Sequence, residues 1–168
     1  IIIGSAIGGT AGAIIGRQMD KQAEELRRDL KGAKVERVGE GIKITFDSGL
    51  LFGFDQSALT PASKSNLQDL AKTLNKYPDT NILIEGHTDN VGEDGYNLTL
   101  SKQRAQSVDA FLTNLGVSSQ RITNKGLGEN YPVASNDTSS GRTQNRRVEV
   151  AIYANKKMKR MARRGQLG

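Results

Sequence analysis

The residue types best suited to bind a charged small molecule gather in the stretch Gly86-His87-Thr88-Asp89-Asn90-Val91-Gly92 and in the helix predicted after it. Asp89 places a carboxylate just after a strongly apolar strand, and Arg104 follows fifteen residues later. A return through a loop and a helix brings the first turns of that helix beside the strand end, where both side chains can face one shallow pocket. A fixed carboxylate and a fixed guanidinium suit a zwitterion, because its ammonium meets the first and its carboxylate the second. A structural salt bridge and a carboxylate at a helix N-terminus are alternatives, and spacing does not separate them.

The elements that position these residues begin with a hairpin, because residues 35–38 and 42–46 alternate in polarity around Gly39-Glu40-Gly41. One helix starts at Thr60-Pro61, with the threonine as N-cap, and stops before Pro78. A second helix has an apolar face and is capped by Gly116.

Short strands are predicted over residues 82–84, from residue 121, and over 148–152, while residues 47–59 and 126–144 are predicted as loops. The order hairpin, helix, strand, helix, strand, loop, strand predicts an α+β fold. We expect a two-layer sandwich with a mixed sheet, two main helices on one face, and the other face more exposed.

Composition limits what such a domain can be. The chain has 168 residues, enough for one core with flanking segments. Its net charge of +6 lies in the tail, because the last fourteen residues hold six lysines and arginines and no acid. The neutral body, without a basic aromatic surface, argues against nucleic-acid binding. We interpret residues 155–168 as a frayed basic end rather than as a contact for anionic lipid or a partner.

Catalysis is disfavoured by what the chain lacks. It has no cysteine and a single histidine, so we predict no metal site, no cofactor and no cysteine nucleophile. The sequence offers no close carboxylate pair and no Gly-x-Ser-x-Gly elbow. His87 is therefore interpreted as a structural, hydrogen-bonded residue rather than as part of a hydrolase triad.

Residues 1–16 differ in composition from everything after them, and together with the charged stretch that follows they are predicted to form a separate segment, residues 1–32. A helix here would carry a flat stripe of glycines suited to close contact in lipid or in an oligomer, formed by Gly4, Gly8, Gly12 and Gly16. Sixteen apolar residues fall short of the roughly 20 that span a bilayer, and a flexible linker is the alternative. A heptad-like seam follows in a charged stretch, predicted as an amphipathic linker that lifts the domain off the membrane; its members are Met19, Ala23, Leu26 and Leu30.

Several ordered motifs resemble one known family. They are Phe52-Gly53-Phe54-Asp55-Gln56-Ser57 before the first helix, residues 84–92, residues 97–105, the late turn Gly126-Leu127-Gly128-Glu129, and Asn145-Arg146-Arg147-Val148-Glu149. Over residues 41–153 the chain resembles OmpA-like peptidoglycan-binding domains. The segment before them resembles the glycine zipper that precedes this domain in some outer-membrane lipoproteins.

The resemblance implies noncovalent binding of the peptide stem of the bacterial cell wall through its diamino acid, usually meso-diaminopimelate. The positions that match are, for the charged clamp, Asp89 and Arg104; for support of ligand and loop, Asn97 and Arg146; for the cleft lining, Phe54 and Asp55; and for main-chain donors, the amides around Val91 and Gly92. Taken alone, Phe54 is better explained as a core residue.

Two hypotheses follow. In the first, residues 1–32 sit at the outer membrane, directly or through a lipid attached upstream, and residues 33–154 bind peptidoglycan on the periplasmic side. Many membrane-held copies on one polymer make weak contacts sufficient. In the second, the glycine stripe, the seam and the tail bind sister copies or a larger envelope assembly, such as a motor or secretion machine, that uses the domain as its anchor.

Overall fold

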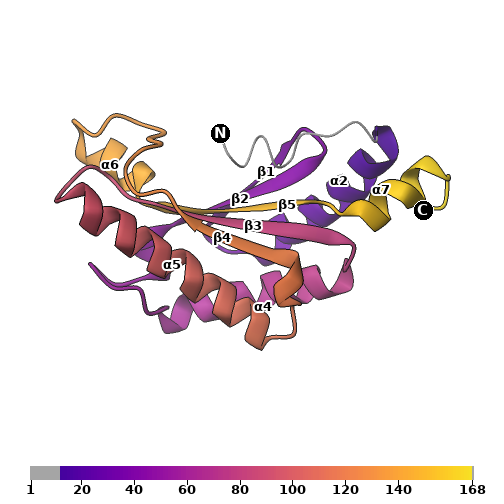
Figure 1. The fold of residues 1–168 in the computed structure, drawn as a ribbon, viewed down its shortest axis with the longest axis horizontal. Coiled ribbons are helices and arrows are strands. Elements are labelled where there is room, and N and C mark those ends of the chain that lie inside the picture. Colours follow the sequence, from indigo (N-terminus) through magenta and orange to yellow (C-terminus); the bar gives the residue numbers. More distant parts are fainter. Residues whose placement is uncertain (1–11, 168) are drawn as a thin grey trace.

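The computed structural model of the chain describes residues 12–167, and its central element is a five-stranded sheet (Figure 1). The strand order is β1-β2-β5-β3-β4, in which β3 and β4 run parallel and the other neighbours antiparallel. This arrangement confirms the α+β class and the predicted order of the main elements. The elements are α2 (Ala13–Asp29), β1 (Ala33–Val38), β2 (Gly41–Asp47), α3 (Ser48–Leu51), α4 (Pro61–Lys76), β3 (Thr80–His87), α5 (Asp94–Asn114), the 3-10 helix η1 (Ser119–Arg121), β4 (Ile122–Gly126), α6 (Ser139–Asn145), β5 (Arg147–Ala154) and α7 (Lys156–Arg163).

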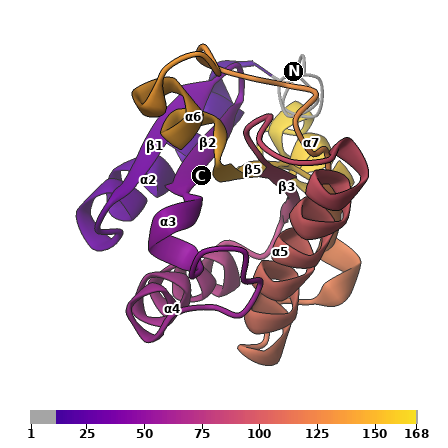
Figure 2. The same ribbon diagram turned by 90° about the vertical axis from the view of Figure 1, so that its left-hand side faces the viewer.

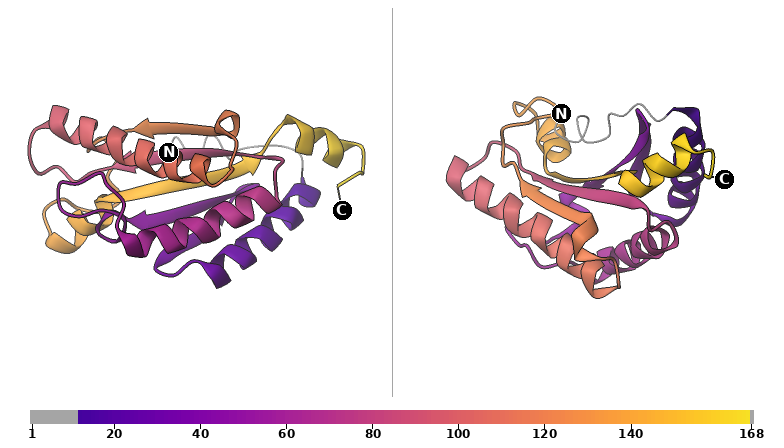
Figure 3. Two further views of the ribbon diagram at one scale, coloured as in Figure 1. Left: turned by 90° about the horizontal axis from the view of Figure 1, so that it is seen from below. Right: turned by 45° about the vertical axis from the view of Figure 1, so that its right-hand side comes forward.

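One face of the sheet carries the hydrophobic core. Alternate residues of the strands, among them Ile44, Ile84 and Val150, are fully buried against the long helices. Three helices, α2, α4 and α5, lie along this face (Figure 3). The prediction of two main helices on this face therefore missed a third, because α2 also belongs to the domain.

The seam of α2 packs on its own domain. Met19, Ala23 and Leu26 are fully buried in the core that also includes α4 and the sheet. The predicted amphipathic linker is therefore wrong, and the boundary at residue 32 cuts through a folded unit. An amphipathic pattern indicates which helix face is covered, but it does not say by what.

The glycine stripe does not continue into α2. Gly12 has φ +80°, which is outside the helical region, and the helix starts after it. Gly16 lies inside α2, where a Cβ atom would come within 3.3 Å of Nη2 of Arg37 rather than face another helix. Gly4 and Gly8 lie outside the described residues. Within residues 12–167, no helix has the length and apolar character needed to cross a bilayer.

The basic tail forms a helix instead of a frayed end. The side chain of Asn155 caps α7 by accepting a hydrogen bond from the Met158 amide at 2.9 Å. Met158 and Ala162, one turn apart, are buried in the core. This pair of apolar residues gives an otherwise cationic helix a face that the domain covers.

Two further helices occur where loops were predicted. Asp47 accepts a hydrogen bond from the Gly49 amide at the start of α3, and Thr138 accepts one from the Gly141 amide at the start of α6, both at 2.9 Å. These caps stabilise helices too short to produce an apolar period.

The position of α5 depends on two glycines that pair across β3 and β4, Gly86 and Gly126. A Cβ atom at Gly86 would lie 2.2 Å from the carbonyl oxygen of Ser101, and one at Gly126 would lie 2.3 Å from the amide nitrogen of Lys102. The helix therefore rests directly on the sheet backbone. Arg104, one turn after Ser101, is held close to the strand end by this contact.

Candidate functional site

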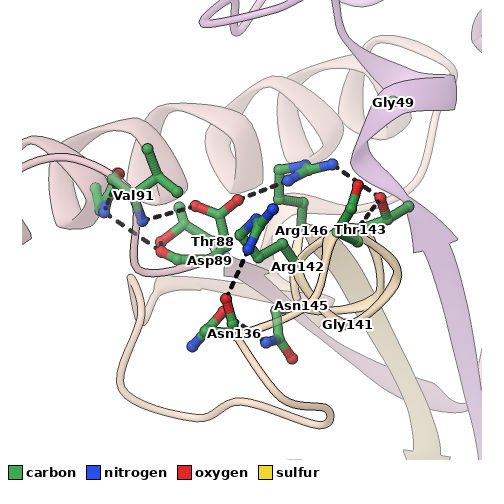
Figure 4. Close-up of polar contacts among 12 residues, drawn as sticks. Gly49, Thr88, Asp89, Val91, Asn136, Gly141, Arg142, Thr143, Asn145 and Arg146 are labelled. Atoms are coloured by element: carbon green, nitrogen blue, oxygen red, sulfur yellow. Dashed lines mark hydrogen bonds and ion pairs between the residues drawn. The ribbon is translucent and has the colours of Figure 1, made fainter.

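The predicted site residues lie at the end of the molecule where β3 finishes and β5 begins (Figure 2). Asp89 follows β3 and is only 7% exposed. Its Oδ1 accepts a hydrogen bond from the Val91 amide at 3.0 Å, and its Oδ2 accepts one from Nη1 of Arg146 at 2.6 Å (Figure 4). The carboxylate is therefore fixed by its own loop on one side and by an arginine on the other.

Asn97 holds that loop in place. Its side-chain amide donates to the carbonyl oxygens of Asp89 at 3.3 Å and Val91 at 3.0 Å, and to Oε1 of Glu129 at 3.3 Å. The role of supporting the loop, implied by the family resemblance, matches this geometry. Gly92 completes the turn with φ +87°, a conformation that favours glycine.

Arg146 lies between the last turn of α6 and β5. It pairs with Asp89, while its Nη2 donates to Oγ1 of Thr143 at 3.0 Å (Figure 4). The Arg146 side chain remains 42% exposed. Of the two arginines in the Asn145-Arg146-Arg147 motif, Arg146 is thus the one at the surface.

Arg104 is 6% exposed and is held by main-chain groups of the loop before α4. Its Nε donates to the carbonyl oxygen of Gln56 at 2.9 Å and its Nη2 to that of Gly53 at 3.5 Å, while the guanidinium lies 5.0 Å from the ring centroid of Phe52. Burial lowers the pKa of Arg104 below its usual value, while the nearby Asp55 acts in the opposite direction.

Asp89 and Arg104 are not joined directly. The ion-pair partner of Asp89 is Arg146, and within residues 12–167 Arg104 forms no ion pair with a carboxylate. Arg146 connects the two, because it contacts Asp89 and lies near enough to Arg104 to lower its pKa. A second guanidinium, that of Arg146, therefore occupies Asp89 and acts electrostatically on Arg104.

Both ends of the clamp keep hydrogen-bonding capacity. A carboxylate offers about four acceptor positions and a guanidinium five donors. Asp89 uses two of its positions on Val91 and Arg146, and Arg104 uses two donors on carbonyl oxygens. The other acceptor positions and donors form no further hydrogen bond within residues 12–167, and only a small part of either side chain is exposed.

Exposed apolar side chains surround these charges. Phe54 is 91% exposed, so the core assignment favoured from its pattern alone is wrong, and Val91 is 62% exposed. Asp55, next to Phe54, has a positive φ of 54°, which is rare outside glycine. Tyr96, half exposed on the first turn of α5 and electrostatically coupled to Arg104, was not predicted. Its position eight residues before Arg104 on one helix could have indicated it.

A separate polar network lies behind the site, on the sheet face opposite the core. Nε2 of His87 is 3.3 Å from Oε1 of Glu85 and 3.9 Å from Oε2 of Glu149, which pairs with Arg147. Arg147 also donates to the carbonyl oxygens of Asn145 at 3.1 Å and Tyr131 at 2.9 Å. Burial tends to raise the pKa of Glu149, but the charges of Arg147, His87 and Lys43 hold it below its ordinary value.

This network corrects the expectation that no two carboxylates lie close together. Glu85 and Glu149 face each other in the β3–β5 register. With His87 they place possible metal-ligand atoms within 4.8 Å of one another, all buried. The positive charges of Arg147 and Lys43 disfavour the binding of a metal cation there, because they already neutralise Glu149. The absence of a metal site stays a prediction, as does the structural role of His87.

A cavity of about 450 Å³ opens over the same polar face rather than between Asp89 and Arg104. Of the predicted site residues, Arg146 alone lines it, together with side chains of β1, β2 and β5 such as Lys34, Lys43 and Glu149. The other predicted binding residues do not line this cavity, and three of them, Asp89, Asn97 and Arg104, are buried.

Comparison with known proteins gives a family and relatives for this arrangement. The model of the OmpA family matches residues 51–146. The chain is similar to the probable lipoprotein YiaD of Escherichia coli strain K12, with 38% identity over 143 residues that cover 84% of this chain and 65% of that protein. It is also similar to the peptidoglycan-binding protein ArfA of Mycobacterium bovis, with 43% identity over 103 residues that cover 61% of this chain and 32% of ArfA.

A solved structure supports the fold independently. The cell wall anchor of the T6SS from Pseudomonas aeruginosa is 28% identical and superposes with a TM-score of 0.69 over 82% of this chain and 97% of that one. The chain spans less than two thirds of the length of the two curated relatives, so it corresponds to only part of each.

Proposed function

Because the chain belongs to the OmpA family, we propose that its folded domain binds peptidoglycan noncovalently and anchors an envelope structure to the cell wall. The family relationship supports this function together with two described relatives, one a peptidoglycan-binding protein and the other a cell wall anchor. The observation that carries the proposal is the convergence of one carboxylate and two guanidiniums, all with spare hydrogen-bonding capacity, at one end of the sheet.

The ligand best suited to these groups is the zwitterionic end of a diamino acid in the peptide stem. Its ammonium would bind Asp89, and its carboxylate would bind Arg104 and Arg146 through paired N–H groups. Phe54 and Tyr96 would cover the aliphatic part of the stem, because they are exposed apolar side chains beside these charges. The domain acts by binding alone, and catalysis forms no part of the proposal.

Sedimentation with purified sacculi tests this proposal. We expect the parent chain to sediment with sacculi, and Asp89→Ala and Arg104→Ala to reduce the affinity at least about 30-fold, because each removes a buried charge from the contact. Asp137→Ala, at an exposed aspartate before α6, is the matched control and should bind as the parent does.

Thermal unfolding of each variant separates lost binding from lost folding. If Asp89→Ala and Arg104→Ala are folded and still sediment with the parent's affinity, the clamp is rejected. Competition with free diaminopimelate adds a second readout that does not depend on any variant.

Attachment to the outer membrane is the finer part of the proposal. Residues 1–16 carry no charged side chain, and a relative is a probable lipoprotein. We place the domain on the periplasmic side of that membrane, held by the apolar segment or by a lipid upstream of it. Fractionation of cells expressing the natural full-length protein should recover it with outer membranes, and recovery with another fraction would contradict this placement.

A second candidate is a subunit of a larger envelope machine, favoured by the likeness to a secretion-system anchor. The seam of α2 is not free for a partner, because it is buried in the domain's own core. Contacts between copies would therefore have to use residues outside this seam. Cross-linking through Gly8→Cys in membranes tests this, and a product containing only the single chain would count against assembly.

A further inference from the structure

Helix α7 presents a dense positive surface that the wall-binding proposal does not use. Five of its residues and the one that follows are lysine or arginine, with no acidic residue among them: Lys156, Lys157, Lys159, Arg160, Arg163 and Arg164. Lys157 pairs with Asp79 at 3.6 Å, and within residues 12–167 none of the other five pairs with a carboxylate. These six account for the whole net charge of the chain.

The cations face outward together. Met158 and Ala162 bind α7 to the core, and Lys156, Arg160 and Arg163 follow one another at spacings of four and three residues on the opposite, exposed face. A helix fixed in this way holds its charges as one rigid array, so a planar anionic surface can contact several at once.

The cationic array of α7 lies at the end of the domain opposite the residues around Asp89. Helix α7 follows β5 directly and packs on α2 near the point where α2 begins (Figure 1). Residues 12–16, the described end of the uncharged stretch, therefore lie at the same end of the domain as the cations (Figure 1). The residues around Asp89 lie at the other end of β5, roughly 23 Å away for an eight-residue strand.

We propose that α7 docks the domain on an anionic phospholipid surface. Clustered lysines and arginines attract such surfaces at about 1 kcal/mol each. The contact would hold the α7 end at the membrane and direct the Asp89 end away from it. The lipid contact stands by itself, whereas this orientation toward the wall rests on the proposed function.

Vesicle sedimentation of the full chain tests the proposal without sacculi. We expect more binding to vesicles of phosphatidylcholine mixed with phosphatidylglycerol than to phosphatidylcholine alone, because only the mixed vesicles carry negative charge. Any insertion of the apolar segment contributes equally to both, so the difference reports the charged contact. The triple variant Arg160→Gln, Arg163→Gln and Arg164→Gln should lower the affinity for the anionic vesicles about 100-fold. A matched triple variant on exposed lysines elsewhere, Lys64→Gln, Lys72→Gln and Lys125→Gln, should lower it much less.

Four results would each overturn the proposal. The parent could bind both kinds of vesicle equally, or its binding to anionic vesicles could be insensitive to ionic strength. The α7 variant could lose no more binding than the matched control. The chain could bind double-stranded DNA without binding anionic vesicles. Unchanged sedimentation of the α7 variant with sacculi would show that the two surfaces act separately.

Discussion

Arg146 and Arg147 are adjacent in the chain yet belong to regions with opposite properties. The Arg147 side chain is 5% exposed and donates to Glu149 and to two carbonyl oxygens on the polar face of the sheet. The Arg146 side chain is 42% exposed and is shared between Asp89 and Thr143 at the sheet end. One guanidinium is enclosed by partners, and the other is only partly occupied.

This difference separates stability from binding. A buried charge whose partners are all internal contributes to the folded state, and its loss leaves another charge uncompensated. A partly exposed charge with unused donors contributes little to stability and can exchange one partner for a ligand. The predictions below test this division.

The largest effect is expected at Arg147. Arg147→Ala leaves Glu149 buried without its main counter-charge and should cost about 3–5 kcal/mol of unfolding free energy. Chemical denaturation measures this value, with Arg146→Ala as the adjacent control. A loss as small as that of the control would mean that the network behind the site is not structural.

Arg146→Ala should have the opposite profile. The unfolding free energy should fall by less than about 1 kcal/mol, since the pair with Asp89 is partly exposed. Affinity for sacculi should fall about tenfold because a donor to the ligand carboxylate is lost. Sedimentation and denaturation of one preparation give both values, and a stable variant with full affinity would exclude Arg146 from the site.

Phe54→Ala tests whether the exposed ring of Phe54 belongs to the binding region. Phe54 is almost fully exposed, so stability should stay within about 0.5 kcal/mol of the parent. Affinity for sacculi should drop roughly threefold if the ring covers the stem. Leu50→Ala, at a half-exposed residue of α3, serves as the control for nonspecific loss of apolar surface.

The smallest effect depends on pH. Because the pKa of Glu149 is below its ordinary value of 4.5 in the folded state, its contribution is present above that value and is lost as pH falls through the folded pKa. The difference in unfolding free energy between the parent and Glu149→Gln should therefore shrink below pH 4.5. A difference constant from pH 7 to pH 3 would contradict the ionised pair with Arg147.

The sheet and its main helices could be predicted from the sequence because their signals are local. The alternation of polar and apolar residues indicated strands. Thr60 and Pro61 indicated the start of α4, where the threonine accepts a hydrogen bond from the Ser63 amide. The role of α2 could not be predicted, because its apolar face fits a partner helix as well as the domain core. The order of α7 was missed although Met158 and Ala162 share a helix face.

For the site, individual residues were easier to predict than their pairing. Asp89, Arg104 and Arg146 lie in one region, but Arg146 is the partner of Asp89 because β3 and β5 are adjacent in the sheet. The same adjacency brings Glu85 beside Glu149. These contacts depend on which strands pair, and neither spacing nor composition contains that information.

The central place of β5 has a mechanical consequence. This strand has neighbours on both sides, connects Arg146 to α7, and runs antiparallel to β2 and β3. A pulling force applied between its two ends would act lengthwise, across hydrogen bonds that lie perpendicular to the strand. Such bonds must rupture together rather than peel apart in sequence, so the domain is arranged to resist tension along the line that joins its two surfaces.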